Sequence, residues 1–96
     1  MTDGQLRMAA RITGRVQGVG FRWWARTRAE ALGLTGWVMN DDEERSVSLV
    51  AEGPADRLDL FEQQLRAGPP SARVDEVDVR REPASGGFAR FEITRP

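Results

Sequence analysis

The sequence of 96 residues contains no cysteine, histidine, tyrosine or lysine, so all fourteen of its basic side chains are arginines. Without cysteine there can be no disulfide, thiolate nucleophile or sulfur-ligated metal. Without histidine there is no Ser-His pair and no usual zinc ligand. Without lysine there is neither a Schiff base nor a Walker-type lysine for phosphate. Any catalytic site must therefore be built from arginine, carboxylate, amide, hydroxyl and backbone groups.

The sequence also lacks a long apolar run, since no segment approaches the roughly 18 residues of a transmembrane helix. The residues after Met1 lack the charged-then-apolar order of a secretory signal peptide. From both observations we expect a cytoplasmic protein without membrane contact. A chain of this length can bury about 60–65% of its unfolded surface, enough for one core. We therefore expect one domain over residues 1–96 and, because no extra apolar helix face is evident, a monomer.

The formal net charge of −1 argues against bulk binding of nucleic acid, so we expect no nucleic-acid partner. The charges are distributed unevenly, because residues 1–28 contain six arginines and a single acid, Asp3. Such an excess of positive charge raises the local concentration of a small anion. Ordinary solvated arginines explain the pattern equally well, except at Arg22, which directly follows a glycine-rich segment.

Hydrophobic periodicity predicts the elements of the fold. Apolar residues alternate, as in half-buried strands, at residues 6–12 and 46–51, and short segments with β-branched or aromatic residues predict further strands at residues 34–40, 74–79 and 88–93. Apolar residues recur at helical spacing from Phe21 to about Gly33 and from Pro54 to Gly68, where proline suits the first helical turn. The order β-α-β-β-α-β with a short extra C-terminal strand predicts an α+β, ferredoxin-like sandwich. In it an antiparallel sheet carries two helices on one face.

Three local features accompany this pattern. Residues 41–45 contain four successive acids and no glycine, which indicates a solvated hairpin tip. The alternation slips between Val74 and Val77, for which the spacing offers no reason. Trp23 and Trp37 are expected to be packing residues rather than ligands.

A glycine-rich segment separates the first strand from the first helix and reads Gly14-Arg15-Val16-Gln17-Gly18-Val19-Gly20-Phe21-Arg22. A turn of this kind leaves several backbone N–H groups pointing into one small volume, which attracts an anion and most often a phosphate. The helix dipole and the guanidinium of Arg22 add positive charge at the same place. The sequence therefore predicts an anion site here.

Two motifs resemble those of the acylphosphatases. The family pattern G-x-V-Q-G-V-x-F-R is present from Gly14 to Arg22, and the pattern G-L-x-G-W-V-x-N from Gly33 to Asn40. The resemblance covers essentially the whole chain. It implies an acylphosphatase, an enzyme that hydrolyses the carboxyl-phosphate bond of small acyl phosphates to carboxylate and inorganic phosphate, without metal or cofactor.

The resemblance also implies the roles of particular residues. Arg22 and the amides of the loop would bind the phosphate, and Asn40 would orient the attacking water. The phosphate-binding loop would consist of Val16, Gln17, Gly18, Val19, Gly20, Phe21 and Arg22.

The chemistry of an acyl phosphate explains why so few groups suffice. Its leaving carboxylate has a pKa of about 4, like that of a side-chain acid, and needs no general acid at neutral pH. Phosphoryl transfer depends mainly on positioning and on neutralising the phosphate oxygens, which Arg22 and backbone amides can do. A carboxamide both donates and accepts hydrogen bonds, so Asn40 can orient water without acting as a base. The proton would pass to the phosphate of the substrate.

Other interpretations are open at this point. The glycines could form only a tight turn, Arg22 could pair with a carboxylate, and Asn40 could be a turn residue. Gln17 is expected to shape the loop through hydrogen bonds. The domain could bind a phosphate or carbamoyl-phosphate-like anion without turning it over, although such modules are usually parts of longer chains. An RNA-binding sheet would need exposed aromatic side chains, and the first strand offers only Arg7, Ala9 and Arg11.

Overall fold

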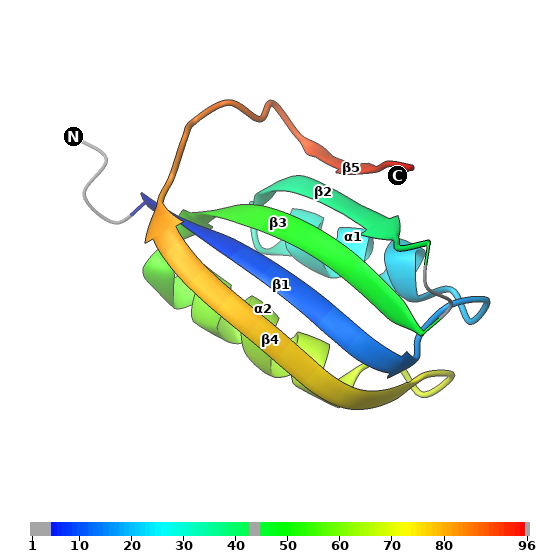
Figure 1. Ribbon diagram of the computed structural model, residues 1–96. Coiled ribbons are helices and arrows are strands. Elements are labelled where there is room, and N and C mark those ends of the chain that lie inside the picture. Colours follow the sequence, from blue (N-terminus) through cyan, green and yellow to red (C-terminus); the bar gives the residue numbers. More distant parts are fainter. Residues whose placement is uncertain (1–4, 43–44, 96) are drawn as a thin grey trace.

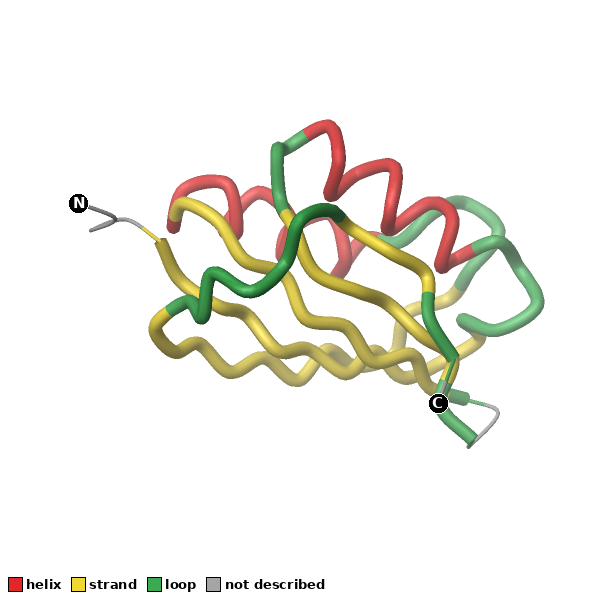
Figure 2. The backbone as a smooth tube through the Cα atoms, turned by 90° about the horizontal axis from the view of Figure 1, so that it is seen from above, coloured by secondary structure: helices red, strands yellow, loops and turns green. Residues whose placement is uncertain are grey.

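The computed structural model describes residues 5–42 and 45–95 (Figure 1). Its elements are β1 (Gln5–Arg15), α1 (Phe21–Ala31), β2 (Thr35–Asn40), β3 (Ser46–Pro54), α2 (Ala55–Ala67), β4 (Arg73–Pro83) and β5 (Phe91–Ile93). The strands form one sheet in the order β4-β1-β3-β2-β5. Both helices cover the same face of this sheet (Figure 1, Figure 2). The predicted ferredoxin-like arrangement is confirmed.

The sheet is antiparallel among its four long strands and parallel at one edge. β1 pairs with β3 and β4, and β2 pairs with β3, all in antiparallel register, whereas β5 pairs with β2 in parallel. The long connection after β4 makes this possible, because it crosses from the β4 edge to the β2 edge at the end of the sheet where β4 stops and β5 begins (Figure 1). The sheet is therefore mixed, a detail that alternation cannot reveal because it carries no strand direction.

The core lies between the sheet and the two helices and follows the predicted periodicity. Alternate residues of the central strands and one stripe of each helix are buried: Met8, Ala10, Ile12, Phe21, Ala25, Ala29, Val47, Leu49, Ala51, Leu58, Phe61 and Leu65. The rings of Phe61 and Phe91 meet edge to face at a centroid distance of 6.2 Å, which fastens β5 to α2 through the core. Within the described residues, neither helix has the length and apolar character that crossing a membrane requires.

A β-bulge explains the slip in the alternation of β4. Thr13 of β1 pairs with Glu76, and the next residue, Gly14, pairs with Val74, which leaves Asp75 as the extra residue. Gly14 has φ 140°, and a Cβ added there would collide with a backbone carbonyl oxygen of β4. Glycine is therefore needed where β1 approaches the loop.

Several boundaries and environments differ from the sequence predictions. Pro54 ends β3 and precedes α2 as its N-cap in an extended conformation (φ −62°, ψ 146°), so it is not part of the first helical turn. β5 begins only at Phe91, because residues 84–90 belong to the connection.

The prediction for Trp23 is wrong, since this side chain is 60% exposed, with the guanidinium of Arg26 4.7 Å from its ring centroid. Trp37 is half-buried on the sheet.

One buried carboxylate fastens the β4–β5 connection to the sheet. Glu52 of β3 is 4% exposed and accepts hydrogen bonds of 2.9 Å from the backbone N–H groups of Ser85 and Gly86 and from the Ser85 hydroxyl. Burial raises the pKa of Glu52, but these bonds and the charge of Arg7 outweigh burial and hold the pKa below its ordinary value. The ionised carboxylate therefore holds the chain that leads to β5.

Candidate active site

Residues 16–20 form the loop between β1 and α1, at one end of the sheet (Figure 1). Gly18 and Gly20 have φ values of 74° and 78°, in the left-handed region that residues other than glycine rarely adopt. No described heavy atom beyond their chain neighbours lies within 4 Å of a Cβ built on either glycine. Glycine therefore allows the backbone conformation at both positions, and no described side chain fills the space beside them.

Apolar side chains hold the loop against the protein. Val16 and Phe21, at its two ends, are each 1% exposed, and Val19 packs partly buried against the same core. The Phe21 ring also contacts Trp24 at a centroid distance of 5.3 Å. Because these side chains pack into the core, the backbone of the loop is presented at the surface.

The backbone amides from Gly18 to Arg22 have no acceptor within the described residues. None of the hydrogen bonds there is donated by these amides. Gly20 is the N-cap residue of α1, and the helix has no side-chain cap and no acid in its first turn. The partial positive charge of the helix N-terminus is thus left uncompensated. A small anion in front of the loop would receive several hydrogen bonds at once.

Arg22 occupies the first turn of α1 and is half-buried. Among the described residues no carboxylate forms an ion pair or hydrogen bond with its guanidinium, which gives the ion-paired alternative no support. Arg22 differs in this respect from the arginines that do pair with carboxylates: Arg7, Arg11, Arg26, Arg45, Arg66, Arg73 and Arg81. The guanidinium is therefore available to an anion held by the loop.

Asn40 is the last residue of β2 and faces the helix layer, because it lies two positions after the buried Val38. Its Oδ1 atom is buried and accepts no hydrogen bond from any described residue. A buried carbonyl oxygen without a donor costs on the order of 1–3 kcal/mol. The fold thus leaves this acceptor to be satisfied by a ligand or by an ordered water.

The side chain of Gln17 joins the loop to the end of β2. Its Nε2 donates to the backbone oxygen of Asp41, at 3.1 Å, and to that of Ser46, at 2.8 Å. Asp41 directly follows Asn40, and its own N–H donates to the Ser46 oxygen at 3.1 Å. Gln17 therefore shapes the loop, as expected, and brings the loop and Asn40 to the same end of the sheet.

The acidic turn differs from its prediction at Asp41. This side chain is 16% exposed, and its Oδ2 accepts hydrogen bonds from the hydroxyls of Ser46, at 2.8 Å, and Ser48, at 3.0 Å. Arg11 lies 3.7 Å from the same oxygen. Asp41 is thus a bonded side chain that fixes the strand end beside Asn40, which sequence spacing did not indicate. Asp42 is exposed, and residues 43 and 44 lie outside the described residues.

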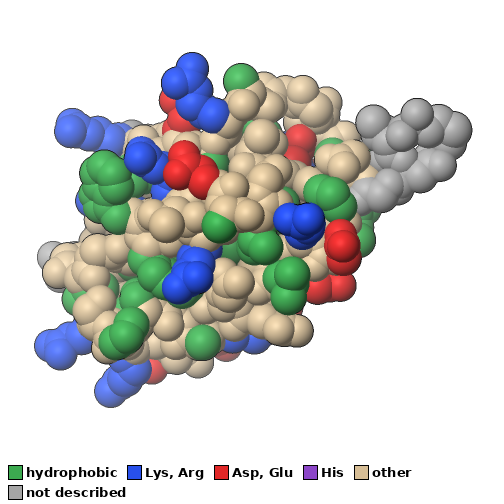
Figure 3. Space-filling model, turned by 180° about the vertical axis from the view of Figure 1, so that it is seen from behind, with side chains coloured by type: hydrophobic (Ala, Val, Ile, Leu, Met, Phe, Trp, Pro, Cys, Tyr) green, Lys and Arg blue, Asp and Glu red, His purple; other side chains and the backbone are tan. Residues whose placement is uncertain are grey.

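Basic side chains surround the end of the molecule that carries the loop. Figure 3 shows several of them projecting from the left end of the molecule, as seen from behind. Arg15, Arg45 and Arg73 line a hollow of about 360 Å³ there. Among the described residues no three carboxylates come together as a metal ion would require. The electrostatic setting of the loop therefore favours an anion.

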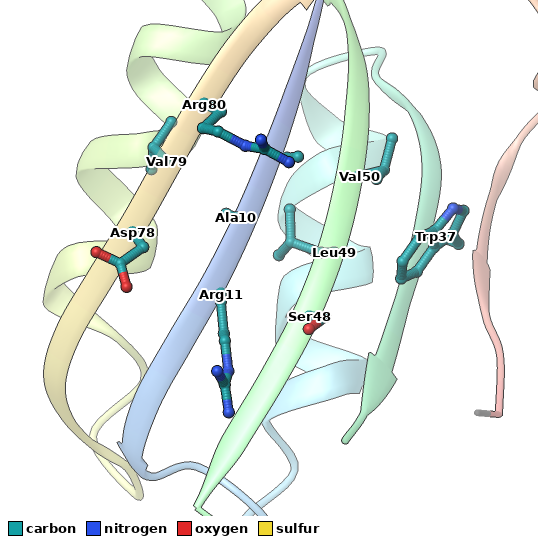
Figure 4. Close-up of a pocket in the computed structure, with 10 residues that line it drawn as sticks. Ala10, Arg11, Trp37, Ser48, Leu49, Val50, Asp78, Val79 and Arg80 are labelled. Carbon is teal, nitrogen blue, oxygen red and sulfur yellow. The ribbon is translucent and has the colours of Figure 1, made fainter. Parts of the chain in front are cut away.

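Another hollow, of about 390 Å³, lies on the helix-free face of the sheet (Figure 4). Trp37, Arg80 and Arg11 surround it, with Ser48 and the small Ala9 between them. None of the predicted site residues lines this hollow, and it lies on the face of the sheet opposite the one to which Asn40 belongs. It is therefore separate from the predicted anion site.

Comparison with known proteins shows the family of the chain. The family model described as acylphosphatase matches residues 8–93. An acylphosphatase of Salinibacter ruber is 48% identical over 98% of both chains. The crystal structure of acylphosphatase from Bacillus subtilis matches with a TM-score of 0.88 and 36% identity, covering 93% of this chain and 98% of that one. The structure of an acylphosphatase from Coxiella burnetii matches with a TM-score of 0.89 and 34% identity, covering 96% and 95%.

Proposed function

The chain belongs to the acylphosphatase family, and from this premise we propose that Arg22 and the loop amides bind the substrate phosphate while Asn40 orients the attacking water. The protein is an acylphosphatase, which converts small acyl phosphates to carboxylate and inorganic phosphate. What we propose is the role of each of these residues in the reaction.

The observation that carries the proposal is the set of backbone amides from Gly18 to Arg22 without a described acceptor. Hydrogen bonds to a charged partner contribute about 1.5–3 kcal/mol each, so several converging amides can hold a phosphate firmly. Arg22 adds a permanent charge and a planar pair of donors beside them. These groups neutralise the phosphate oxygens without the metal that many phosphoryl-transfer sites employ.

The second part of the proposal assigns the water to Asn40. The buried Oδ1 without a donor is a place where one ordered water would gain a hydrogen bond that the fold does not supply. Gln17 supports this role indirectly, because it holds the loop against the residue that follows Asn40. A phosphate in the loop and a water on Asn40 would then lie side by side.

The reaction proceeds in one displacement at phosphorus. The water oxygen bonds to phosphorus while the bond from phosphorus to the acyl oxygen breaks, and that electron pair leaves with the carboxylate. The proton released by the water passes to an oxygen of the transferred phosphate. The carboxylate is stable at neutral pH, so no protein acid is required, which agrees with a chain that has no histidine.

The proposal extends to the whole molecule. Residues 1–96 would act as one domain, as a cytoplasmic monomer, on a small substrate and without metal, cofactor or nucleic acid. The one-domain part of this proposal is supported by the hydrophobic core of the described residues and by the membership of all described strands in one sheet.

The direct test is hydrolysis of benzoyl phosphate by the purified protein, with and without a metal chelator. We expect turnover that the chelator does not change. Arg22→Ala should lower kcat/KM by about a hundredfold or more, since a charge-assisted contact to the reacting group is lost. Arg28→Ala, an exposed arginine of the same helix, is the matched control and should retain activity. Phosphate binding without turnover in the wild-type protein would instead favour the non-catalytic anion-binding module.

A further inference from the structure

A hydroxyl from a distant part of the chain contacts the loop. Ser71, in the connection between α2 and β4, donates from its Oγ to the backbone carbonyl of Val19 at 2.8 Å. The two residues lie 52 positions apart in the sequence. No feature of the glycine-rich motif indicates this contact, because Ser71 lies in a separate segment.

The connection that carries Ser71 is a stiff turn. The N–H of Ala72 donates to the oxygen of Pro69 at 3.0 Å, which closes a turn with Pro70 and Ser71 at its centre. Proline at the second position of such a turn has its φ already fixed. α2 ends immediately before, with the N–H of Gly68 bonded to Gln64 at 2.9 Å. The turn therefore fixes the backbone from which the exposed Ser71 hydroxyl reaches the loop.

The bond to Val19 fixes the direction of the next amide. A trans peptide points its C=O and its following N–H in opposite directions, and no cis peptide is present among the described residues. With the Val19 carbonyl held toward Ser71, the N–H of Gly20 is directed away from Ser71. From this geometry we infer that Ser71 is a positioning residue, which orients the Gly20 amide toward the phosphate.

The loop needs such a contact because a glycine follows this peptide. The peptide between Val19 and Gly20 turns by rotation about ψ of Val19 and φ of Gly20, and Gly20 has no side chain that restricts its φ. A turned peptide would present a carbonyl oxygen, instead of an N–H, to the phosphate. The Ser71 bond opposes that rotation and also polarises the peptide, which strengthens its N–H as a donor.

This inference rests on the proposed function of the loop, and its test separates the two. Ser71→Ala, Ser71→Thr and the control Thr27→Ala are compared with the wild-type protein for inhibition by inorganic phosphate, kcat/KM and melting temperature. Thr27 is the matched control because it is exposed and its hydroxyl also donates to a backbone oxygen, that of Trp23 at 2.9 Å, outside the loop.

We expect Ser71→Ala to raise the phosphate inhibition constant and lower kcat/KM, each by about three- to tenfold, with little change in melting temperature. Ser71→Thr, which keeps the hydroxyl, should have a phosphate inhibition constant and a kcat/KM close to those of the wild type. Thr27→Ala should change neither of these two constants. Wild-type phosphate affinity and kcat/KM in Ser71→Ala would overturn the inference while leaving the proposed function intact. A wild-type protein that neither binds phosphate nor hydrolyses acyl phosphates would overturn the proposed function, and this inference with it.

Discussion

Two side-chain oxygens of the described residues are buried without a hydrogen-bond donor, Oδ1 of Asn40 and Oε1 of Gln64. The absence of a donor cannot by itself mark a functional residue, since both atoms share it. The surroundings distinguish them. Asn40 ends β2 beside a loop with unpaired amides, whereas Gln64 lies on α2 among Trp24, Ala67 and Pro69. We therefore assign a chemical role to Asn40, because its available acceptor lies beside the candidate anion site.

The different surroundings of Asn40 and Gln64 predict different effects of substituting each residue. Asn40→Ala should lower kcat by at least about a hundredfold, because the water loses its orienting group, and should leave the inhibition constant for inorganic phosphate near the wild-type value. Steady-state kinetics with phosphate as competitive inhibitor measures both. Gln64→Ala is the control and should change neither constant. An unchanged kcat in Asn40→Ala would remove this residue from the mechanism.

At the scale of one element, the loop depends on backbone conformation more than on side-chain chemistry. Gly20 and Gly33 form a natural comparison, because both have positive φ, 78° and 71°, and open space where a Cβ would be added. One lies at the start of α1 in the loop, and the other follows the end of the same helix. A substitution at either position imposes similar backbone strain, but only the substitution at Gly20 changes the anion site.

We therefore expect Gly20→Ala and Gly33→Ala each to lower the free energy of unfolding by about 1 kcal/mol. Only Gly20→Ala should also weaken the binding of inorganic phosphate, because only its backbone amide faces the anion. Chemical denaturation and phosphate titration measure the two effects separately. Equal phosphate affinity in the two variants would show that the loop conformation does not matter for binding.

The elements also show what a sequence can predict. Local patterns located both helices, all five strands and the loop, because burial of alternate or helically spaced residues depends on near neighbours. The bulge at Asp75, the parallel pairing of β5 and the bonds of Asp41 depend on contacts between distant segments, which periodicity does not record. The contact from Ser71 to the loop is of the same kind.

At the scale of the whole molecule, Glu52 links the centre of the sheet to its edge. It lies on β3, close to Arg7 of β1, and its carboxylate binds the connection that leads to β5. Burial of a carboxylate is unfavourable unless donors surround it, and three donated hydrogen bonds satisfy this one. This ionised group therefore contributes to the placement of the last strand, together with the pairing of β5 with β2 and the ring contact of Phe91.

This dependence predicts how stability varies with pH. In the unfolded chain the Glu52 carboxyl has its ordinary pKa of 4.5, and in the folded protein its pKa is lower. Between the two values the unfolded chain binds more protons, so the free energy of unfolding rises with pH. The stabilisation from Glu52 is complete well above pH 4.5 and is lost as the pH falls through the folded pKa.

Glu52→Gln should accordingly lower the free energy of unfolding at pH 7 by about 2–4 kcal/mol and reduce its dependence on pH below the ordinary carboxyl pKa of 4.5. Denaturation at a series of pH values measures both effects. Glu82→Gln on β4, which replaces an exposed carboxylate, is the control and should have little effect. A Glu52→Gln protein as stable as the wild type would contradict the role of this carboxylate.

Titration of the 15N-labelled protein with inorganic phosphate, followed by NMR, tests the central claim most directly. The claim is that the backbone amides from Gly18 to Arg22 hold the phosphate together with the guanidinium of Arg22. We predict saturable shifts of these amide signals in the wild-type protein and weaker binding in Arg22→Ala. Phosphate that leaves these signals unchanged, or that shifts the amides of another surface instead, would contradict the account.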